Sequence, residues 1–528
     1  MRSLHYPGRS PAYARKAMCA TSHPLASQTA LSVLKDGGNA VDAAIAATAV
    51  LCVVEHPMTG IGGDCFALVS KPREKPFALN ASGRAPAGLT ADYLIGAGIS
   101  KIETQSAHAV TVPGAVDGWA TLLADYGSRS LKELLQPAIG YASDGFAVAP
   151  RVAFDWAGSQ KKLLNNPNAS KHFLVDGKAP SVGDVMRFPN LAKSLNMIAD
   201  GGRDAFYEGE IAADIVQELK AQGGVHTLED FASQRSTYVE PISVNYRGLD
   251  ILELPPNNHG VVVLIMLKMM DRIGKIAGDP DSADRHHIML EVARLAYAMR
   301  DAFVADPEMA DVPVDHMLDD GVIDNLATRI DNAKARPDIG TLPQPNGSDT
   351  VYLSIVDKDG MAVSFINSLF ADFGAGISTD KTGIMLHNRG QGFVVNPGHP
   401  NCVAPGKRPL HTLIPALAMD NGELAMSFGV MGGAYQPAGH AHVLANMLDY
   451  GMDAQEALDA QRTFFDGDKV LVEQTASEAL RSGLAAKGHD VGERTVPWGG
   501  GQIVQIDRGR GTLIGASDPR KDGCALGY

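Results

Sequence analysis

Apolar residues in the first seventy positions form helical patterns followed by an extended one. The run from Val41 to Val54 is rich in alanine and nearly free of polar residues, which predicts a buried helix. Residues 31–35 end a preceding helical pattern just before Gly37-Gly38, a pair that suits a helix C-terminus. Residues 66–69 follow Gly62-Gly63 as a short apolar run and predict a strand.

The middle of the chain, residues 128–335, is richer in helical periodicity. From His287 to Val304 apolar residues recur on one stripe, which predicts an amphipathic helix that ends before Asp306-Pro307. His287 and Glu291 lie one turn apart on this helix and could in principle hold a metal ion. A capping or surface role is favoured, because no third ligand is placed on that face. No metal site is therefore expected.

The chain changes character at residues 336–349. This segment, RPDIGTLPQPNGSD, holds three prolines, two glycines and no apolar run, which indicates an exposed loop or linker. Residues 351–356 and 362–366 then predict a hairpin, followed by strands at 424–428 and 501–506 and a helix near 438–449. A long loop that leads into the first strand of a sheet is expected to be functional or cleaved.

Composition and charge narrow the class of protein. The 528 residues are 45% hydrophobic and 20% charged, enough for a sizeable core without disulfides or metals. They suit two to four ordinary domains or one large α/β unit. A net charge of −14 without an evident basic patch argues against nucleic acid or an anionic membrane as partner.

The remaining whole-chain signals point to a cytoplasmic protein. Five cysteines without a CxxC pair argue against a disulfide framework or a zinc knuckle. The N-terminus lacks the apolar segment of a signal peptide, and the longest apolar run, residues 43–54, is too short to span a bilayer. Residues 60–63, GIGG, are not a full dinucleotide fingerprint, and the chain has no P-loop, HExxH or GxSxG motif, so no cofactor is expected.

Thr350 alone, at the start of a predicted strand, has an ordinary structural explanation. Its surroundings, SDTVYLSIVDKDGMAVSFINSLFADFGAGI, resemble the start of the small subunit in the γ-glutamyltranspeptidase family of N-terminal-nucleophile hydrolases. Further motifs follow in family order over nearly the whole chain: GGNAVDAA (37–44), HPMTGIGGDCF (56–66), VPGAVDGW (112–119), HTLEDF (226–231), ADPEM (305–309), GVMGGA (429–434), DYGM (449–452) and GASDPR (515–520).

The resemblance implies an α/β fold, a four-layer αββα sandwich that forms one domain. It also implies self-cleavage between Asp349 and Thr350 into a large fragment, 1–349, and a small fragment, 350–528, which stay together as a heterodimer. The number of heterodimers per particle is left open.

The same resemblance assigns the chemistry. Cleavage would free the α-amino group of Thr350, with a pKa of roughly 7.7–8.0, to act as the base for its own hydroxyl nucleophile. Ser368, 18 residues on, would hold the Thr350 rotamer. Gly432-Gly433 match the family's oxyanion-hole glycines, with a plain turn as the alternative reading.

The substrate-recognition positions depart from the transpeptidase pattern. Ser82 stands where transpeptidases have the arginine that binds the α-carboxylate. Phe370 replaces an asparagine, and Gly392 replaces the aspartate that holds the substrate's amino group. His411-Thr412 replace a pair of serines. A γ-glutamyl substrate would therefore leave its ammonium group unpaired, which is costly in a closed pocket.

Cationic and polar residues remain that suit a carboxylate without an amine: Arg84, Arg389, His411 and Thr412. Arg84 is the first choice and His411 the reserve, with stabilisation of its own loop as the alternative role for Arg389. The NASGRAP and HNRGQGF variants are similar to the oxamate-hydrolysing branch of the family. The expected reaction is hydrolysis of a small carboxylate-bearing amide, with oxamate giving oxalate and ammonia as the best guess. Alternatives are a γ-glutamyl hydrolase or transpeptidase, a cephalosporin-type acylase, and an unprocessed, non-catalytic binding protein.

Overall fold

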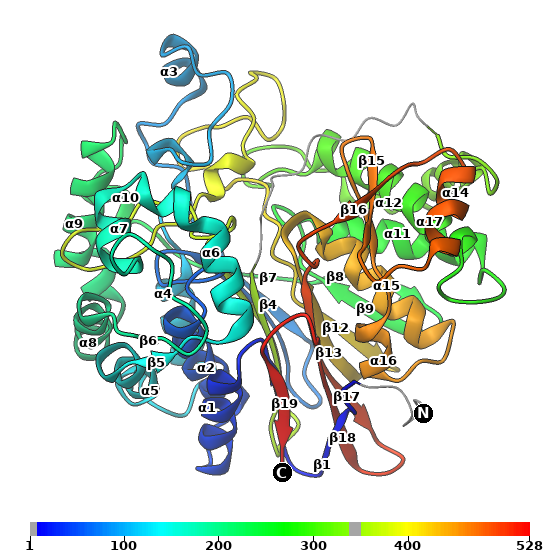
Figure 1. Ribbon diagram of the computed structural model, residues 1–528, viewed down its shortest axis with the longest axis horizontal. Helices are drawn as coiled ribbons and strands as arrows, with labels where there is room; N and C mark the ends of the chain where they lie inside the picture. Colours follow the sequence, from blue (N-terminus) through cyan, green and yellow to red (C-terminus); the bar gives the residue numbers. More distant parts are fainter. Residues whose placement is uncertain (1–7, 337–349) are drawn as a thin grey trace.

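Two antiparallel seven-stranded sheets pack face to face between two layers of helices (Figure 1). The computed structural model describes residues 8–336 and 350–528. The 337–349 segment, with Asp349 on one side of the expected cleavage point, lies outside the described residues.

The first sheet carries the hairpin expected from the sequence. Its strands run, in spatial order, β19 (Cys524–Gly527), β2 (Met18–Thr21), β10 (Val351–Val356), β11 (Ala362–Ser368), β3 (Asp64–Ser70), β4 (Phe77–Ala81) and β7 (Thr237–Val239). Neighbouring strands are antiparallel throughout.

The second sheet combines strands from three parts of the chain. Its order is β1 (Ala12–Ala14), β18 (Thr512–Ser517), β17 (Gly500–Asp507), β13 (Glu423–Met431), β12 (Ala416–Asp420), β9 (Leu249–Glu253) and β8 (Ile242–Tyr246). The strands expected at 424–428 and 501–506 are confirmed as parts of β13 and β17. The β8–β9 hairpin lies in the segment that the sequence assigned mainly to helices.

Strand β10 shows why the sheets pack in this way. Its residues Val351, Leu353 and Ile355 pack in the helical layer, whereas Tyr352 and Val356 belong to the core between the sheets. A strand with apolar residues on both faces must be covered on both faces, which a four-layer arrangement provides.

The helices beside the first sheet come from the N-terminal part of the chain. They include α1 (Pro24–Lys35), α2 (Ala40–Val54), α4 (Ala115–Tyr126), α5 (Leu131–Asp144), α6 (Pro150–Leu164), α7 (Pro167–Phe173), α8 (Pro189–Tyr207), α9 (Glu210–Ala221) and α10 (Leu228–Ala232). Every residue of α2 is buried, and Asn39 and Asp42 form a capping box at its start, which confirms the alanine-rich helix. The short helix α3 (Ala91–Gly96) projects at the top of Figure 1.

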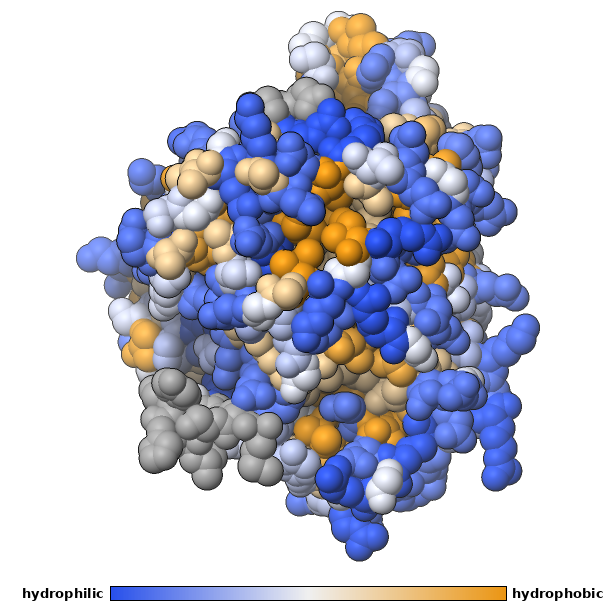
Figure 2. Space-filling model, turned by 90° about the vertical axis from the view of Figure 1, so that its right-hand side faces the viewer, coloured by the Kyte–Doolittle hydropathy of each residue, from blue (hydrophilic) through white to orange (hydrophobic). Residues whose placement is uncertain are grey.

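The second helical layer covers the other sheet. It contains α11 (Gly260–Ile273), α12 (Ala283–Phe303), α13 (Val314–Met317), α14 (Asp320–Thr328), α15 (Gln436–Leu448), α16 (Ala454–Asp459) and α17 (Glu478–Ala486), beside a small sheet of β14 (Thr463–Asp466), β15 (Lys469–Glu473) and β16 (Asp490–Arg494). Its outer face is largely hydrophilic, with apolar residues gathered near the middle (Figure 2).

Helix α12 is more deeply enclosed than its amphipathic pattern suggests. It packs against α11, α15, α17 and β14, and every residue from Arg285 to Tyr297 is buried. His287 and Glu291 are 0% and 1% exposed, so the expected surface or capping role for this pair is wrong. Helices α15 and α17 and strand β14, which cover α12, lie more than a hundred residues farther along the chain, so a local pattern cannot reveal this burial.

The four-layer fold expected from the family resemblance is confirmed. Within the part of the chain that the structure describes, no helix is both long and apolar enough to cross a bilayer.

Candidate active site

Three polar residues lie in a row at one end of the first sheet. Thr350 immediately precedes β10, Ser368 ends β11 and Asp64 begins β3. The register pairs Ser368 with Asp64, and Val351 with the residue before Ser368. The Thr350 hydroxyl donates to Ser368 Oγ at 3.1 Å, and both side chains are buried. The structure thus brings the expected nucleophile and its supporting hydroxyl together.

Thr350 is on the face of the sheet that meets the second sheet. Farther along β10, Ser354 Oγ lies 2.9 Å from Ser427 Oγ of β13. The Tyr352 ring lies over Gly429, where an added Cβ would come within 2.5 Å of it. Ser354 and Tyr352 thus face Ser427 and Gly429 in turn, and the same spacing would place Thr350 near Met431.

Gly432 and Gly433 directly follow Met431, where the chain turns from β13 through the 3-10 turn η3 (Gly433–Tyr435) into α15. Their φ values are 121° and 54°, both in the region that favours glycine. The Gly432 carbonyl accepts from the Tyr435 amide at 3.0 Å. Backbone amides at such a strand-to-helix turn suit an oxyanion hole. That role stays a prediction, since a plain turn would have the same backbone.

Ser368 also connects Thr350 to Phe370. The Phe370 amide donates to Ser368 Oγ at 2.8 Å, so this oxygen accepts from both Thr350 and Phe370. Phe370 is buried and has a φ of 77°, a left-handed conformation that bulky residues adopt only where their surroundings hold them.

Arg389 stacks on the Phe370 ring. Its guanidinium carbon lies 4.0 Å from the ring centroid, and Nη1 donates to Thr412 Oγ1 at 2.8 Å. The side chain is 1% exposed, and Nε and Nη2 have no hydrogen-bond partner among the described residues. Burial lowers the pKa of Arg389 to about 9, against the opposing effect of negatively charged Asp64. The group is therefore still a cation at neutral pH.

His411 is a neutral imidazole that holds Asp64 in place, rather than a cation available to a substrate. Its Nε2 donates to Asp64 Oδ2 at 3.0 Å, and its Nδ1 accepts from the Leu413 amide at 3.3 Å. Burial and the nearby charge of Arg389 lower the pKa of His411 to about 3, although Asp64 opposes this. With both ring nitrogens occupied, His411 positions Asp64 and has no donor left for a substrate.

Asp64 was given no role by the sequence. Its Oδ1 accepts from the amides of Gly83 and Gly114, each at 3.0 Å, and its Oδ2 lies 3.0 Å from His411 Nε2 and 3.4 Å from His387 Nδ1. Burial alone would raise the pKa of Asp64, but the two histidines hold it well below its usual range. The signal in the sequence was an acidic residue opening an otherwise apolar strand.

Arg84, the first choice for binding a substrate carboxylate, instead forms hydrogen bonds with Glu308 and the backbone of Gly406. Its Nη2 donates to Glu308 at 2.8 Å and its Nη1 to the Gly406 carbonyl at 3.0 Å. Arg408 donates to the same Glu308 at 2.8 Å. Among the described residues, no hydrogen bond or ion pair joins the Arg84 side chain to Thr350 or Ser368, and a binding role for Arg84 stays a prediction.

Two of the substituted positions, Ser82 and Gly392, are tightly enclosed. The buried Ser82 hydroxyl donates to Asn80 Oδ1 at 2.9 Å. A Cβ added at Gly392 would lie 2.7 Å from the Leu410 carbonyl oxygen. An aspartate at Gly392 would therefore require the backbone to shift, which accords with the loss of an ammonium-binding acid.

Two face-to-face sheets between helical layers, with a buried threonine at the start of a central strand held by a serine hydroxyl, define an N-terminal-nucleophile hydrolase. The chain belongs to the gamma-glutamyltranspeptidase family, whose model matches residues 26–528.

Relatives cover nearly the full chain. The oxamate amidohydrolase proenzyme of Klebsiella pneumoniae is 37% identical over 527 residues, covering 97% of this chain and 98% of that protein. The glutathione hydrolase-like YwrD proenzyme of Bacillus subtilis is 36% identical over 522 residues, with the same coverage. The crystal structure of a cephalosporin acylase from Bacillus halodurans matches with a TM-score of 0.92 and 37% identity, covering 100% of this chain and 99% of that one. The chain is therefore a self-processing hydrolase of this family.

Proposed function

We propose that the mature protein hydrolyses a small amide that carries a carboxylate, with oxamate as the first candidate. The observation that carries this proposal is Arg389, a buried cation with two nitrogens that lack partners among the described residues. It stacks on Phe370, whose amide is bonded to the Ser368 oxygen that also receives the Thr350 hydroxyl.

Maturation begins with the Thr350 hydroxyl. Its Oγ1 attacks the Asp349 carbonyl carbon, the Asp349–Thr350 peptide bond breaks, and the acyl group moves from nitrogen to oxygen. Water then hydrolyses the ester, which leaves a carboxylate on the large fragment and a free α-amino group on Thr350. Fragments 1–349 and 350–528 remain together because both contribute strands to each of the two sheets.

In turnover, the free amine takes the proton from the Thr350 hydroxyl as its oxygen attacks the amide carbonyl. Ser368 holds the Thr350 rotamer, and the amides of Gly432 and Gly433 stabilise the developing oxyanion. The C–N bond then breaks, and the proton leaves with the nitrogen as ammonia. Water hydrolyses the threonyl ester and releases oxalate when oxamate is the substrate.

Substrate choice follows from charge. A buried guanidinium without a counter-ion is costly, and a substrate carboxylate at Nε and Nη2 of Arg389 would remove that cost with charge-assisted hydrogen bonds. Phe370 and Gly392 offer no acid to an ammonium group beside the carboxylate. The pocket therefore favours an anionic amide over a zwitterionic glutamyl group.

One observation favours a second candidate, an acylase. The cephalosporin acylase of Bacillus halodurans and the oxamate amidohydrolase of Klebsiella pneumoniae are each 37% identical to this chain. A γ-glutamyl hydrolase or transpeptidase, and an unprocessed binding protein, complete the alternatives.

A substrate panel on one processed preparation separates these functions. We expect kcat/KM to be highest for oxamate, and far lower for oxamide, the matched control in which a neutral amide replaces the carboxylate. If γ-glutamyl-p-nitroanilide exceeds oxamate by about tenfold, a transpeptidase with an altered pocket is the better description. Preference for a cephalosporin side-chain amide would indicate an acylase, and an unprocessed, inactive chain would indicate a binding protein.

A further inference from the structure

The amides of Gly432 and Gly433 can stabilise an oxyanion only if the turn that carries them is held rigidly. Glycine loses more conformational freedom on folding than any other residue, and neither glycine has a side chain that could fix its own backbone. Their φ values of 121° and 54° must therefore be held by contacts on either side of the pair.

On the N-terminal side of the glycines, a histidine takes the place of a neighbouring strand. Strand β12 pairs with β13 no farther than Phe428, which lies opposite Ala416. The Val430 amide lies beyond that point and donates to His440 Nε2 at 3.0 Å. His440 belongs to α15, which packs so closely that a Cβ added at Gly439 would lie 2.8 Å from Val430 Cγ1. The histidine thus holds β13 where the strand β12 has ended.

Glu253 fixes the orientation of the His440 ring. Because Nε2 accepts a hydrogen bond from an amide, the ring proton lies on Nδ1 and is donated to Glu253 Oε1 at 2.8 Å. Both side chains are 0% exposed, and burial lowers the pKa of His440 to about 3. The ring is therefore neutral at physiological pH and directs its lone pair at the Val430 amide.

On the C-terminal side, a tyrosine from α12 holds the next peptide. The Tyr297 hydroxyl donates to the carbonyl of Ala434, the residue directly after Gly433. The phenol is 0% exposed, and burial raises the pKa of Tyr297 well above its usual value, so the group keeps the proton that it donates. The two glycines therefore lie between two positions that side chains of other elements hold.

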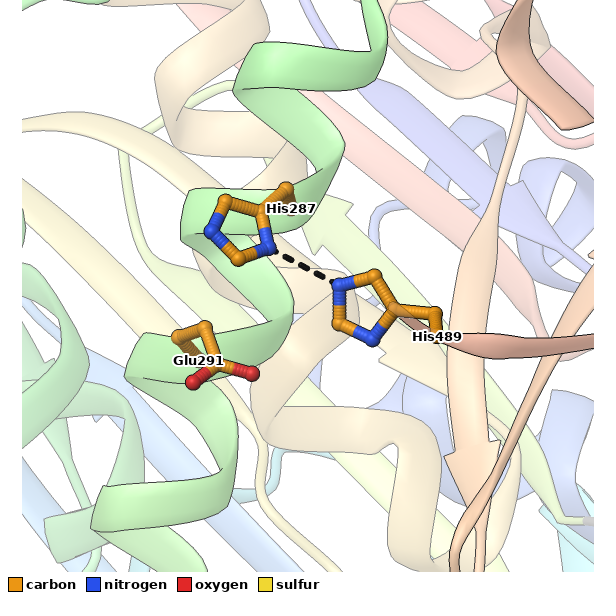
Figure 3. Close-up of side chains that lie close together, drawn as sticks. All are labelled: His287, Glu291 and His489. Carbon is orange, nitrogen blue, oxygen red and sulfur yellow. Dashed lines mark hydrogen bonds between the residues drawn. The ribbon is translucent and has the colours of Figure 1, made fainter. Parts of the chain in front are cut away.

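Helix α12, which supplies Tyr297, is itself fixed nearer its N-terminus (Figure 3). His287 Nε2 lies 2.7 Å from the Asp331 carbonyl oxygen, which can only accept, so Nε2 carries the proton. His287 Nδ1 therefore accepts from Nε2 of His489, which lies between α17 and β16, at 2.8 Å. The hydroxyl that holds Ala434 thus comes from a helix anchored to its neighbours.

We propose that His440 and Tyr297 hold the glycine pair in the geometry of an oxyanion hole, one residue on each side. Both are positioning residues, because they act through the backbone of Val430 and Ala434, and Glu253 acts through His440. The inference rests on the oxyanion role proposed above for the two glycines. If the side chains served only to stabilise the fold, their loss would lower the melting temperature and leave kcat unchanged.

Turnover and ground-state binding separate these two roles. Tyr297→Phe removes one hydroxyl and keeps the ring, and His440→Leu removes the acceptor for the Val430 amide. Each should lower kcat for oxamate by about tenfold or more, part of the roughly 100- to 1,000-fold that one oxyanion donor contributes. KM, and the inhibition constant of oxalate, which binds without forming an oxyanion, should change by less than about threefold.

A conservative variant tests whether the hydrogen bond itself matters. His440→Gln should recover most of the kcat that His440→Leu loses, because its side-chain oxygen can accept from Val430 while its nitrogen donates to Glu253. A leucine-like loss in folded His440→Gln would show that the shape of the imidazole matters and not the bond to the amide.

Tyr246→Phe is the matched control for Tyr297→Phe. Tyr246 is 0% exposed in the same apolar core, and its hydroxyl donates to Asp449 Oδ2 at 2.6 Å, away from the glycine pair. This variant should have a lower melting temperature and an unchanged kcat.

The variants are compared as folded, processed protein, and Tyr297→Phe decides alone if His440→Leu fails to fold. An active wild-type protein with unaffected kcat in Tyr297→Phe and His440→Leu would overturn the inference and leave the proposed function intact. If the substrate panel favours another amide, the same comparison is made with that amide and its acid product. A processed wild-type protein that hydrolyses none of the amides would refute the proposed function, and the inference with it.

Discussion

Arg389 and Arg84 carry the same charge, but their nitrogen atoms are used differently. Both terminal nitrogens of Arg84 donate hydrogen bonds, to Glu308 and to the Gly406 carbonyl. Nε and Nη2 of Arg389, by contrast, have no hydrogen-bond partner among the described residues. The sequence favoured Arg84 from its place in the motif. The structure shows that Arg389 stacks on Phe370, whose amide donates to the same Ser368 oxygen as the Thr350 hydroxyl.

Replacing these arginines separates their roles. We expect Arg389→Ala to lower kcat/KM for oxamate by about 10- to 100-fold, because a charge-assisted hydrogen bond contributes roughly 1.5–3 kcal/mol. Arg84→Ala should cost less activity, and its main effect should be a lower melting temperature. Steady-state kinetics and thermal melts on both variants check this. A large loss in Arg84→Ala with a small one in Arg389→Ala would return the carboxylate site to Arg84.

Thr350 and Ser368 can be tested through maturation as well as turnover. Thr350→Ala should stay full length and inactive, Thr350→Ser should still cleave, and Ser368→Ala should fold with reduced turnover. Wild-type protein should give fragments of roughly 37 and 19 kDa, scaled by length from 55.7 kDa, the smaller beginning at Thr350. Intact mass, terminal sequencing and ammonia release are the measurements. An active wild-type sample that remains one chain would refute the nucleophile.

At the scale of elements, local patterns predicted the segments that are apolar throughout or that form a hairpin. Helix α2 and the β10–β11 pair are examples. The β8–β9 hairpin was missed, although apolar and polar residues alternate along β8. The strand that pairs with β9, β12, lies far along the chain, so the sheet is not visible in the local pattern.

The candidate active site likewise depends on contacts between residues far apart in the sequence. Thr350 and Ser368 could be named from motifs near each other, but Asp64 joins them only through the pairing of β3 with β11. His489 likewise reaches His287 only through the packing of α17 against α12. No local pattern contains these contacts.

The position of β10 depends on the small size of Gly429. A methyl group there would come within 2.5 Å of the Tyr352 ring, and Tyr352 donates or accepts bonds with Ser354 and Ser364. Gly429→Ala should therefore displace β10, slow self-cleavage and lower stability by about 1–3 kcal/mol. Denaturant unfolding and a cleavage time course measure both effects.

Gly158→Ala is the matched control for that substitution. Gly158 lies inside α6 with nothing within 4 Å of an added Cβ, so alanine should raise stability by about 0.5–1 kcal/mol. Cleavage in Gly429→Ala at the control's rate would show that Tyr352 does not position Thr350.

For the whole molecule, buried histidines make stability depend on pH. Burial lowers the pKa of His23, His56 and His226 to about 4 and that of His411 to about 3. The unfolded rings take up protons near pH 6.5, so the unfolded state binds more protons below that value. Stability should therefore fall as the pH drops from about 6.5 toward 4, by up to ~1.4 kcal/mol per pH unit for each histidine.

Melting temperatures between pH 7.5 and 4.5 test this expectation. His226→Gln, which removes one titrating ring, should show a shallower decline than the wild-type protein. A melting temperature that stays constant over this range would contradict the neutral, buried state of these rings.

The packing of the two sheets against each other also determines when self-cleavage before Thr350 can occur. Thr350 meets Ser368 from the same hairpin, but β10 is held in place by β2 near the beginning of the chain and faces β13, which pairs with β17 near its end. Nearly the entire polypeptide must therefore be synthesised before β2, β13 and β17 can hold the Thr350 hydroxyl in position for attack. Self-cleavage would then mark each molecule as fully synthesised and correctly assembled, and truncated chains would never acquire a free amino-terminal threonine.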